Sequence, residues 1–315
     1  MNGKAKIKPV LFLWGLLAVA VLMAACDILS FKNEQVTLYP ILYSDEDGIY
    51  SMREDGGGKN RFLSLGEEQA FYPNRSADGK KIVFNTGLNA TTLGPSIYVI
   101  NSDGTGLAPA HVYQPDEIPL YGDEPKWSPD GTKIMFDYFE IYIFDLAADR
   151  LLRVTDHRGT DAGGSWSPDG EKIVFNSNRE GFDEEGIDSP YHVYQVDLAT
   201  MEVEKLTGGM DYAEAPIWGA SGERILFKGS RDAVEGLYVV ELETGAIHNI
   251  HYPSEEASYY PTAWSDDEQE ILVQARDPLA VKSLRLFKHN IVTGDKKLLL
   301  ERAGFFTSFD WYDPK

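Results

Sequence analysis

The sequence contains 315 residues, of which 50 are Asp or Glu and 29 are Lys or Arg, so its formal net charge is −21 at pH 7. A field of this sign repels nucleic acid and anionic lipid headgroups, which argues against nucleic acid as a partner. The chain has one cysteine, so no disulfide can form within it and packing must supply its stability.

The amino terminus is predicted to be an export signal. Three lysines within the first eight residues precede an uncharged, largely apolar stretch over residues 9–25. The only cysteine, Cys26, follows the small residues that end this stretch. A basic region, an apolar core and small residues before a cleavage point are the parts of a secretory signal. The residues around Cys26 also resemble a bacterial lipobox, in which the cysteine is lipidated after cleavage.

These features predict a lipoprotein of the bacterial cell envelope. We expect a signal peptide over residues 1–25, a lipidated tether over residues 26–36 that anchors the protein to a membrane, and a folded domain over residues 37–315 outside the cytoplasm. An uncleaved membrane anchor with an incidental cysteine is the alternative.

An aromatic turn motif recurs along the rest of the chain. The two best copies, at Trp127 and Trp166, both read Trp-Ser-Pro-Asp-Gly. Weaker copies begin at Arg75, Trp218 and Trp264, and a truncated copy begins at Trp311. Successive copies lie 39 to 52 residues apart, a period typical of repeat architectures. The Pro-Asp-Gly step favours a chain reversal, because proline presets φ and the residues after it tolerate positive φ.

Short apolar runs after each motif predict strands. The first run of each unit, such as Lys81–Phe84, reads Lys-Ile-Val-Phe or a variant, and the next, such as Ile97–Ile100, reads Ile-Tyr-Val-Ile or a variant. Further runs such as Val203–Thr207 close the units. β-Branched and aromatic residues bounded by turn formers favour strands. Four antiparallel strands repeated radially make a β-propeller, so the predicted fold class is all-β.

The two ends of the repeat region are predicted to complete one blade together. Pro40–Tyr43 and Gly48–Met52 read as a second and a third strand with no motif before them, whereas Phe309–Trp311 reads as a first strand with nothing after it. Joining them gives a ring of six four-stranded antiparallel blades without exposed strand edges.

The repeat resembles that of the TolB-type six-bladed propellers, which is often described as WD40-like. The copies at Trp127 and Trp166 match closely, the copy at Arg75 lacks the Trp, and that at Trp218 lacks the Pro and the Asp. The resemblance covers nearly all of the chain after about residue 36 and implies a scaffold, which hosts many functions. TolB itself carries an α/β domain ahead of its propeller, and none is recognised here, so its specific role is not implied.

No pattern for catalysis is recognised. The sequence has no G-x-S-x-G elbow, and its six histidines show neither H-x-x-x-H nor H-E-x-x-H spacing. We therefore predict no cofactor and assign no metal ligand. In oligogalacturonate lyases, which have a similar fold, histidines from different blades bind a divalent metal, so a metal in the channel stays open as an alternative.

The connections that enter the innermost strands are predicted to gather around the mouth of the central channel. They combine aromatic residues, which offer rigid contact area, with carboxylates, which fix orientation. Alternatively, the carboxylates keep the rim soluble and the aromatic residues cover the inner strands. The candidate ligand-binding residues are Tyr72, Asp123, Glu124, Asp161, Tyr212, Glu214, Tyr259, Tyr260 and Phe306.

Two classes of function stay open. The first is a monomeric, membrane-tethered, non-catalytic module that binds a protein or an envelope glycan through this rim, and the lack of a catalytic pattern favours it. The second is a glycan lyase or a cyclase-type propeller enzyme with a divalent metal in the channel. Two histidines and a carboxylate within metal-ligand reach in the channel would contradict the first.

Overall fold

The computed structural model describes residues 37–45, 47–66, 69–86, 97–111, 122–181, 189–250, 258–276, 283–303 and 309–312. The chain divides into two units, residues 1–36 and residues 37–315, and every described residue belongs to the second. The predicted signal peptide, tether and lipidation site at Cys26 fall outside the described residues, as does Phe306. Within the described ranges, no helix is long and apolar enough to cross a membrane.

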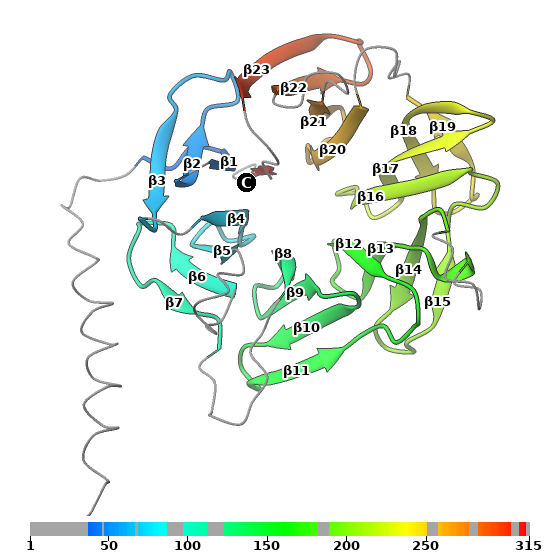
Figure 1. Ribbon diagram of the computed structural model, residues 1–315, viewed down its shortest axis with the longest axis horizontal. Coiled ribbons are helices and arrows are strands. Elements are labelled where there is room, and N and C mark those ends of the chain that lie inside the picture. Colours follow the sequence, from blue (N-terminus) through cyan, green and yellow to red (C-terminus); the bar gives the residue numbers. More distant parts are fainter. Residues whose placement is uncertain are drawn as a thin grey trace, which may run out of the picture. The chain divides into compact units, whose positions relative to one another are not determined.

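Residues 37–315 form six four-stranded antiparallel sheets, which stand as blades around a central axis (Figure 1). This arrangement confirms the predicted all-β, six-bladed propeller. Apart from a single 3-10 turn at Arg179–Gly181, the regular structure of the described residues is all strand. From the innermost strand outward, the blades are β4 (Ala70–Arg75), β5 (Lys81–Thr86), β6 (Ile97–Asn101) and β7 (Ala108–Pro109) in blade 1; β8 (Asp123–Trp127), β9 (Lys133–Asp137), β10 (Ile141–Asp145) and β11 (Arg150–Arg153) in blade 2; β12 (Asp161–Trp166), β13 (Lys172–Ser177), β14 (His192–Asp197) and β15 (Val203–Lys205) in blade 3; β16 (Tyr212–Trp218), β17 (Arg224–Arg231), β18 (Val234–Glu241) and β19 (Ile247–Asn249) in blade 4; β20 (Ser258–Trp264), β21 (Glu270–Arg276), β22 (Ser283–Asn290) and β23 (Lys296–Ala303) in blade 5; and β24 (Phe309–Trp311), β1 (Ile41–Asp45), β2 (Gly48–Met52) and β3 (Asn60–Ser64) in blade 6.

Blade 6 combines strands from both ends of the repeat region, as predicted. Strand β24 pairs antiparallel with β1, so that Tyr43 lies opposite Phe309 and Ile41 lies opposite Trp311. The rings of Tyr43 and Phe309 stack with their centroids 6.1 Å apart. The pairing covers the inner edge of β1, which would otherwise be free to pair with another chain.

Aromatic residues on the second and third strands build the interior of the blades. Phe84, Phe175 and Phe227 are fully buried at equivalent positions of their second strands. Four blades repeat one stacked pair of rings with centroids 5.6 to 6.1 Å apart: Phe84 with Tyr98, Phe136 with Tyr142, Phe175 with Tyr194 and Phe227 with Tyr238. The motif tryptophans join neighbouring blades, because Trp127 shares a core cluster with Val83 of blade 1 and Trp218 shares one with Val174 of blade 3.

The Ser and Asp of the turn motif bond to each other and to the turn backbone. Ser128 Oγ donates to Asp130 Oδ1 at 2.6 Å, and Asp130 Oδ1 accepts from Thr132 N at 3.0 Å. The hydrogen bond from Ser128 is the main reason that the pKa of Asp130 falls to about 2. The same Ser–Asp bond recurs in Ser76 with Asp78, Ser167 with Asp169, and Ser265 with Asp267. The motif is therefore a structural device of the fold.

Blade 4 builds its turn differently, because the copy at Trp218 has no Asp. Glu268, from the turn of blade 5, accepts hydrogen bonds from Ser221 N at 2.7 Å and from Arg224 Nε at 2.7 Å. The Glu268 side chain is buried, with 3% of it exposed. A carboxylate from the neighbouring blade thus replaces the missing one.

Candidate functional site

The innermost strands begin at one end of the ring, which we call the channel mouth and define as residues 69–73, 122–125, 161–164, 211–215 and 258–261. A β-bulge interrupts four of these strands at the same place, shifting the register between Phe71 and Asn74, Asp123 and Lys126, Ala162 and Ser165, and Glu214 and Ile217. Inside each bulge one residue has positive φ: Tyr72 (52°), Glu124 (48°), Gly163 (64°) and Ala215 (52°). For residues other than glycine this conformation costs about 1–2 kcal/mol, and such strain gathers at functional sites.

A second repeated feature anchors the mouth. A polar residue ends the apolar run of every second strand: Ser44, Asn85, Asp137, Asn176, Lys228 and Gln274. Several of these side chains reach the innermost strand of the next blade. Asn85 Nδ2 donates to Asp123 Oδ1 at 2.8 Å, and Ala215 N donates to Asn176 Oδ1 at 3.3 Å. These residues were not predicted from the sequence, because each only follows an apolar run; the available signal was the recurrence of a polar residue there in every repeat.

Between blades 4 and 5, three of the predicted rim residues surround one lysine. Lys228 Nζ donates to Glu214 Oε1 at 2.7 Å and lies 4.0 Å from the centroid of the Tyr260 ring and 5.5 Å from that of Tyr212. Lys228 is 7% exposed. Burial by itself would lower the pKa of this ammonium, but its hydrogen bonds to Glu214 and Tyr260 raise the pKa above its usual value. Burial also raises the pKa of Tyr212 to about 12.

In blade 2, two other rim residues lie beside a third carboxyl group. Asp123 pairs in register with Asp137 at the end of β9. Asp137 Oδ2 accepts from Gly163 N at 3.4 Å, whereas Asp137 Oδ1 is buried and has no hydrogen-bond partner among the described residues. Burial, followed by the charges of Glu124 and Asp123, raises the pKa of the Asp137 carboxyl well above its usual range. Three carboxyl groups therefore gather at this end of the mouth, and the approach of Lys126 Nζ to within 3.9 Å of Glu124 Oε2 balances part of their charge.

Replacing Asp137 with asparagine should stabilise the fold at neutral and alkaline pH. The folded-state pKa of Asp137 lies above its unfolded value, so wild-type stability is intact below the unfolded value, about 4, and is lost as the pH rises through the folded value. Urea unfolding of both proteins should give Asp137→Asn the higher free energy of unfolding at pH 8, with the difference closing toward pH 4. A variant less stable than wild type at pH 8 would contradict this assignment.

The two remaining described rim residues, Asp161 and Tyr259, contact the interior of the protein. Asp161 is fully buried and pairs with Arg179 Nη2 at 2.9 Å. The Arg179 guanidinium in turn lies over the ring of Tyr194, 4.8 Å from its centroid. Tyr259 packs against an apolar cluster that includes Leu226 and Ile271. The Asp161 carboxylate is therefore held inside blade 3, whereas Tyr259, like Tyr72, Glu124, Tyr212, Glu214 and Tyr260, is partly accessible and Asp123 is exposed.

Polar side chains also connect blades along the channel from the position one residue before the motif, at Asn74, Ser165 and Asp310. Asp310 accepts from Asn74 Nδ2 at 2.9 Å and from Arg75 N at 3.0 Å. Asn74 Oδ1 accepts from Trp127 N at 2.8 Å, and Ser165 Oγ accepts from Trp218 N at 3.2 Å. Burial raises the pKa of the Asp310 carboxyl. Because each of these groups is hydrogen-bonded across a blade boundary, they act as a structural belt.

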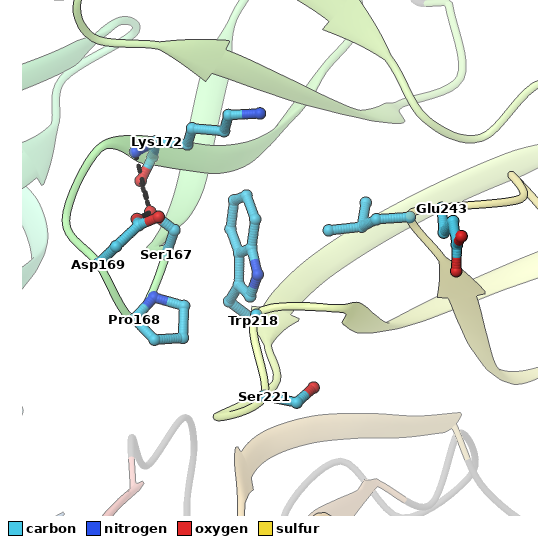
Figure 2. Close-up of a pocket in the computed structure, with 9 residues that line it drawn as sticks. Ser167, Pro168, Asp169, Lys172, Trp218, Ser221 and Glu243 are labelled. Atoms are coloured by element: carbon cyan, nitrogen blue, oxygen red, sulfur yellow. Dashed lines mark hydrogen bonds between the residues drawn. The ribbon is translucent and has the colours of Figure 1, made fainter.

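The opposite end of the ring carries a hollow of about 420 Å³ between blades 3 and 4. Trp218 stands in this hollow, facing the turn that contains Pro168 (Figure 2). The polar groups of that turn are already bonded: Ser167 Oγ donates to Asp169 Oδ1 at 2.5 Å and accepts from Lys172 N at 2.9 Å. Since other blades repeat these bonds, the hollow follows from blade geometry and we assign no ligand to it.

The described histidines lie on outer strands or in loops. His192, His248 and His289 belong to β14, β19 and β22, and His111 Nδ1 lies 2.7 Å from Asp149 Oδ1. Among the described residues, no group of three or more His, Cys, Asp or Glu side chains could hold a metal ion. The residues that the structure describes therefore do not fit a metal centre in the channel.

No protein-family model matches the sequence, and no curated protein matches it significantly. Solved structures do match. TolB from Acinetobacter baumannii is 20% identical with a TM-score of 0.70, covering 94% of this chain and 71% of that one. A putative TolB from Agrobacterium tumefaciens is 16% identical with a TM-score of 0.63, covering 87% and 99%. An oligogalacturonate lyase in complex with manganese is 14% identical with a TM-score of 0.53, covering 84% and 74%. The likeness is one of fold: residues 37–315 form a TolB-like six-bladed β-propeller.

Proposed function

We propose that the protein is a non-catalytic binding module that engages a protein or an envelope glycan through the channel mouth. The observation that carries this proposal is the gathering of acidic and aromatic side chains on strands that cross-blade hydrogen bonds hold in place. Tyr212, Glu214 and Tyr260 surround Lys228, and Asp123 pairs in register with Asp137. Rigid aromatic and charged groups on a fixed scaffold are typical of binding surfaces.

An envelope glycan lyase or a cyclase-type enzyme is the second candidate, and the fold likeness to a manganese-bound lyase favours it. The described histidines lie on outer strands or in loops, and no described cluster fits a metal ion. We therefore derive no metal-dependent step for this chain and prefer the binding function.

We also infer that the protein acts in the bacterial envelope, outside the cytoplasm, as a monomer held by a lipid on Cys26. The basic residues, apolar stretch and small residues that precede this cysteine support export and lipidation. A single lipid chain binds membranes weakly, so stable attachment would require more than one acyl chain on the same cysteine.

The test is capture by the full-length, lipidated protein from solubilised membranes of its native host. Replacing Tyr72 and Glu124 together with alanine should reduce the captured partner by about tenfold or more. Both positions already have positive φ, so alanine adds no backbone strain, and the melting temperature should stay near that of wild type. Mass spectrometry would quantify captured protein and glycan.

Glu243→Ala is the matched control, because it removes one carboxylate at the opposite end of the ring, beside the hollow in Figure 2. It should capture as much partner as wild type. Equal capture by wild type and the Tyr72/Glu124 double variant would refute binding through the mouth. A purified chain that retains a divalent metal and cleaves a glycan would establish the enzymatic alternative.

A further inference from the structure

The hairpin tip of blade 2 presents two large aromatic side chains to solvent. Tyr138 and Phe139 connect β9 to β10, and they are 51% and 65% exposed. Their rings meet edge to face with centroids 5.1 Å apart. No other aromatic side chain in the described part of the chain is comparably exposed. An exposed aromatic pair of this kind marks an interaction surface.

The tip is held in place on both sides. Tyr138 N donates to Glu140 O at 2.9 Å, and Asp161 N, on the innermost strand of blade 3, donates to Phe139 O at 2.9 Å. The buried Glu140 carboxylate accepts from Thr155 Oγ1 at 2.7 Å and from His157 N at 2.9 Å. The aromatic pair is therefore preorganised, so the tip would lose little conformational entropy when a partner binds to it.

The fold does not require a phenylalanine at the tip. Phe139 has a φ of 60°, a conformation that glycine adopts without steric cost. Turns elsewhere in the ring place glycine at positive φ, as at Gly245 (69°) and Gly294 (81°). The Phe139 ring fills no core space, since most of it faces solvent. An interaction surface explains why a strained, exposed aromatic residue stands at this position, whereas packing does not explain it.

The tip adjoins the acidic side of the channel mouth. Asp137 directly precedes Tyr138 and pairs in register with Asp123, and its buried Oδ1 meets no hydrogen-bond partner in the described part of the chain. A nearby cation, Lys126 Nζ, lies 3.9 Å from Glu124 Oε2 and donates to Gly164 O at 2.7 Å. The negative charge of Asp123 and Glu124 is thus only partly balanced, and a cation from a partner would complement it.

We propose that Tyr138, Phe139, Asp123 and Glu124 form a docking surface for a polypeptide segment that combines an apolar side chain with a neighbouring Lys or Arg. This inference rests on the proposed function, because it names the partner class for the same mouth. The apolar side chain packs on the two rings, and the cation lies beside the carboxylates. The net charge of −21 would speed the encounter with a basic segment.

The experiment selects a random peptide library, displayed on phage, against the purified full-length protein. Enriched peptides should place Lys or Arg next to an aliphatic or aromatic residue. A synthetic copy of the most enriched peptide should bind Phe139→Gly about tenfold more weakly than wild type, as measured by fluorescence anisotropy. Leu151→Ser, which alters an exposed apolar residue on the outermost strand of the same blade, should bind like wild type.

Stability separates a docking role from a structural one. Because glycine relieves the positive φ, Phe139→Gly should melt at the wild-type temperature or above it. A lower melting temperature, equal peptide binding by Phe139→Gly, or enrichment of peptides without basic residues would each overturn the proposal. In the envelope capture experiment, partner retained by Phe139→Gly but lost by the Tyr72/Glu124 variant would overturn the docking surface alone and leave the proposed function standing.

Discussion

Replacing Asp310 with alanine is expected to lower the free energy of unfolding by about 3 kcal/mol, because hydrogen bonds to a charged group contribute roughly 1.5–3 kcal/mol each. Asp310 accepts two such bonds, from Asn74 Nδ2 and from Arg75 N, across the boundary between blades 6 and 1. Alanine leaves both donors without this acceptor. Burial raises the pKa of Asp310, so the desolvation of its carboxylate offsets part of the gain, and the expected loss is smaller than the sum of two bonds.

Urea unfolding followed by circular dichroism would measure this loss, and Ser165→Ala is the matched control. Ser165 occupies the same position in blade 3 but accepts one bond, from Trp218 N at 3.2 Å, so its replacement should cost about 1 kcal/mol. An Asp310→Ala variant no less stable than Ser165→Ala would show that the boundary of blade 6 depends on strand pairing rather than on this carboxylate.

Replacing Glu268 with alanine should cost about 3 kcal/mol, the lower end of the range for breaking a buried ion pair. The lower end applies because Arg224, its partner, keeps a third of its side chain exposed. Glu268 also accepts from Ser221 N at 2.7 Å, which makes it the acceptor for the turn of blade 4. Glu243→Ala, an exposed carboxylate near the same turn, should change stability by less than about 0.5 kcal/mol.

A rescue distinguishes loss of this acceptor from a general effect of the substitution. Gly219→Ser with Ser221→Asp would rebuild the Ser–Asp pair that the other turns contain. A Cβ at Gly219 would lie 2.4 Å from Glu268 Oε1, so the pair should destabilise wild type but restore stability to Glu268→Ala. Failure to restore it would mean that Glu268 matters for its bond to Arg224 rather than for the turn.

The sequence predicted the blades well because each repeat carries its own turn and strand signals. Trp-Ser-Pro-Asp-Gly and the Ile-Val-Phe runs are local patterns, and even the pairing of Phe309–Trp311 with β1 followed from counting repeats. Strand ends were less accurate: the predicted strand Val203–Thr207 ends at Lys205, because Thr207 Oγ1 instead accepts from Val193 N at 2.9 Å.

The channel mouth was harder to predict, because its contacts join residues of different blades. Lys228 only follows an apolar run in the sequence, and the approach of Glu214 and Tyr260 makes it part of the rim. Asp161 looked like a rim carboxylate, yet Arg179 holds it in the interior. The positive φ of Phe139 has no signature in composition, since glycine or asparagine would be expected there.

The seam between β1 and β24 also sets the order in which the ring can form. Tyr43 pairs across the seam with Phe309, so this contact between distant parts of the sequence can form only after the other blades have been synthesised. Closing so long a loop is slow, and until it closes, β1 offers an unpaired edge to other chains. The period between synthesis and ring closure is therefore when this protein is most exposed to proteases and to aggregation.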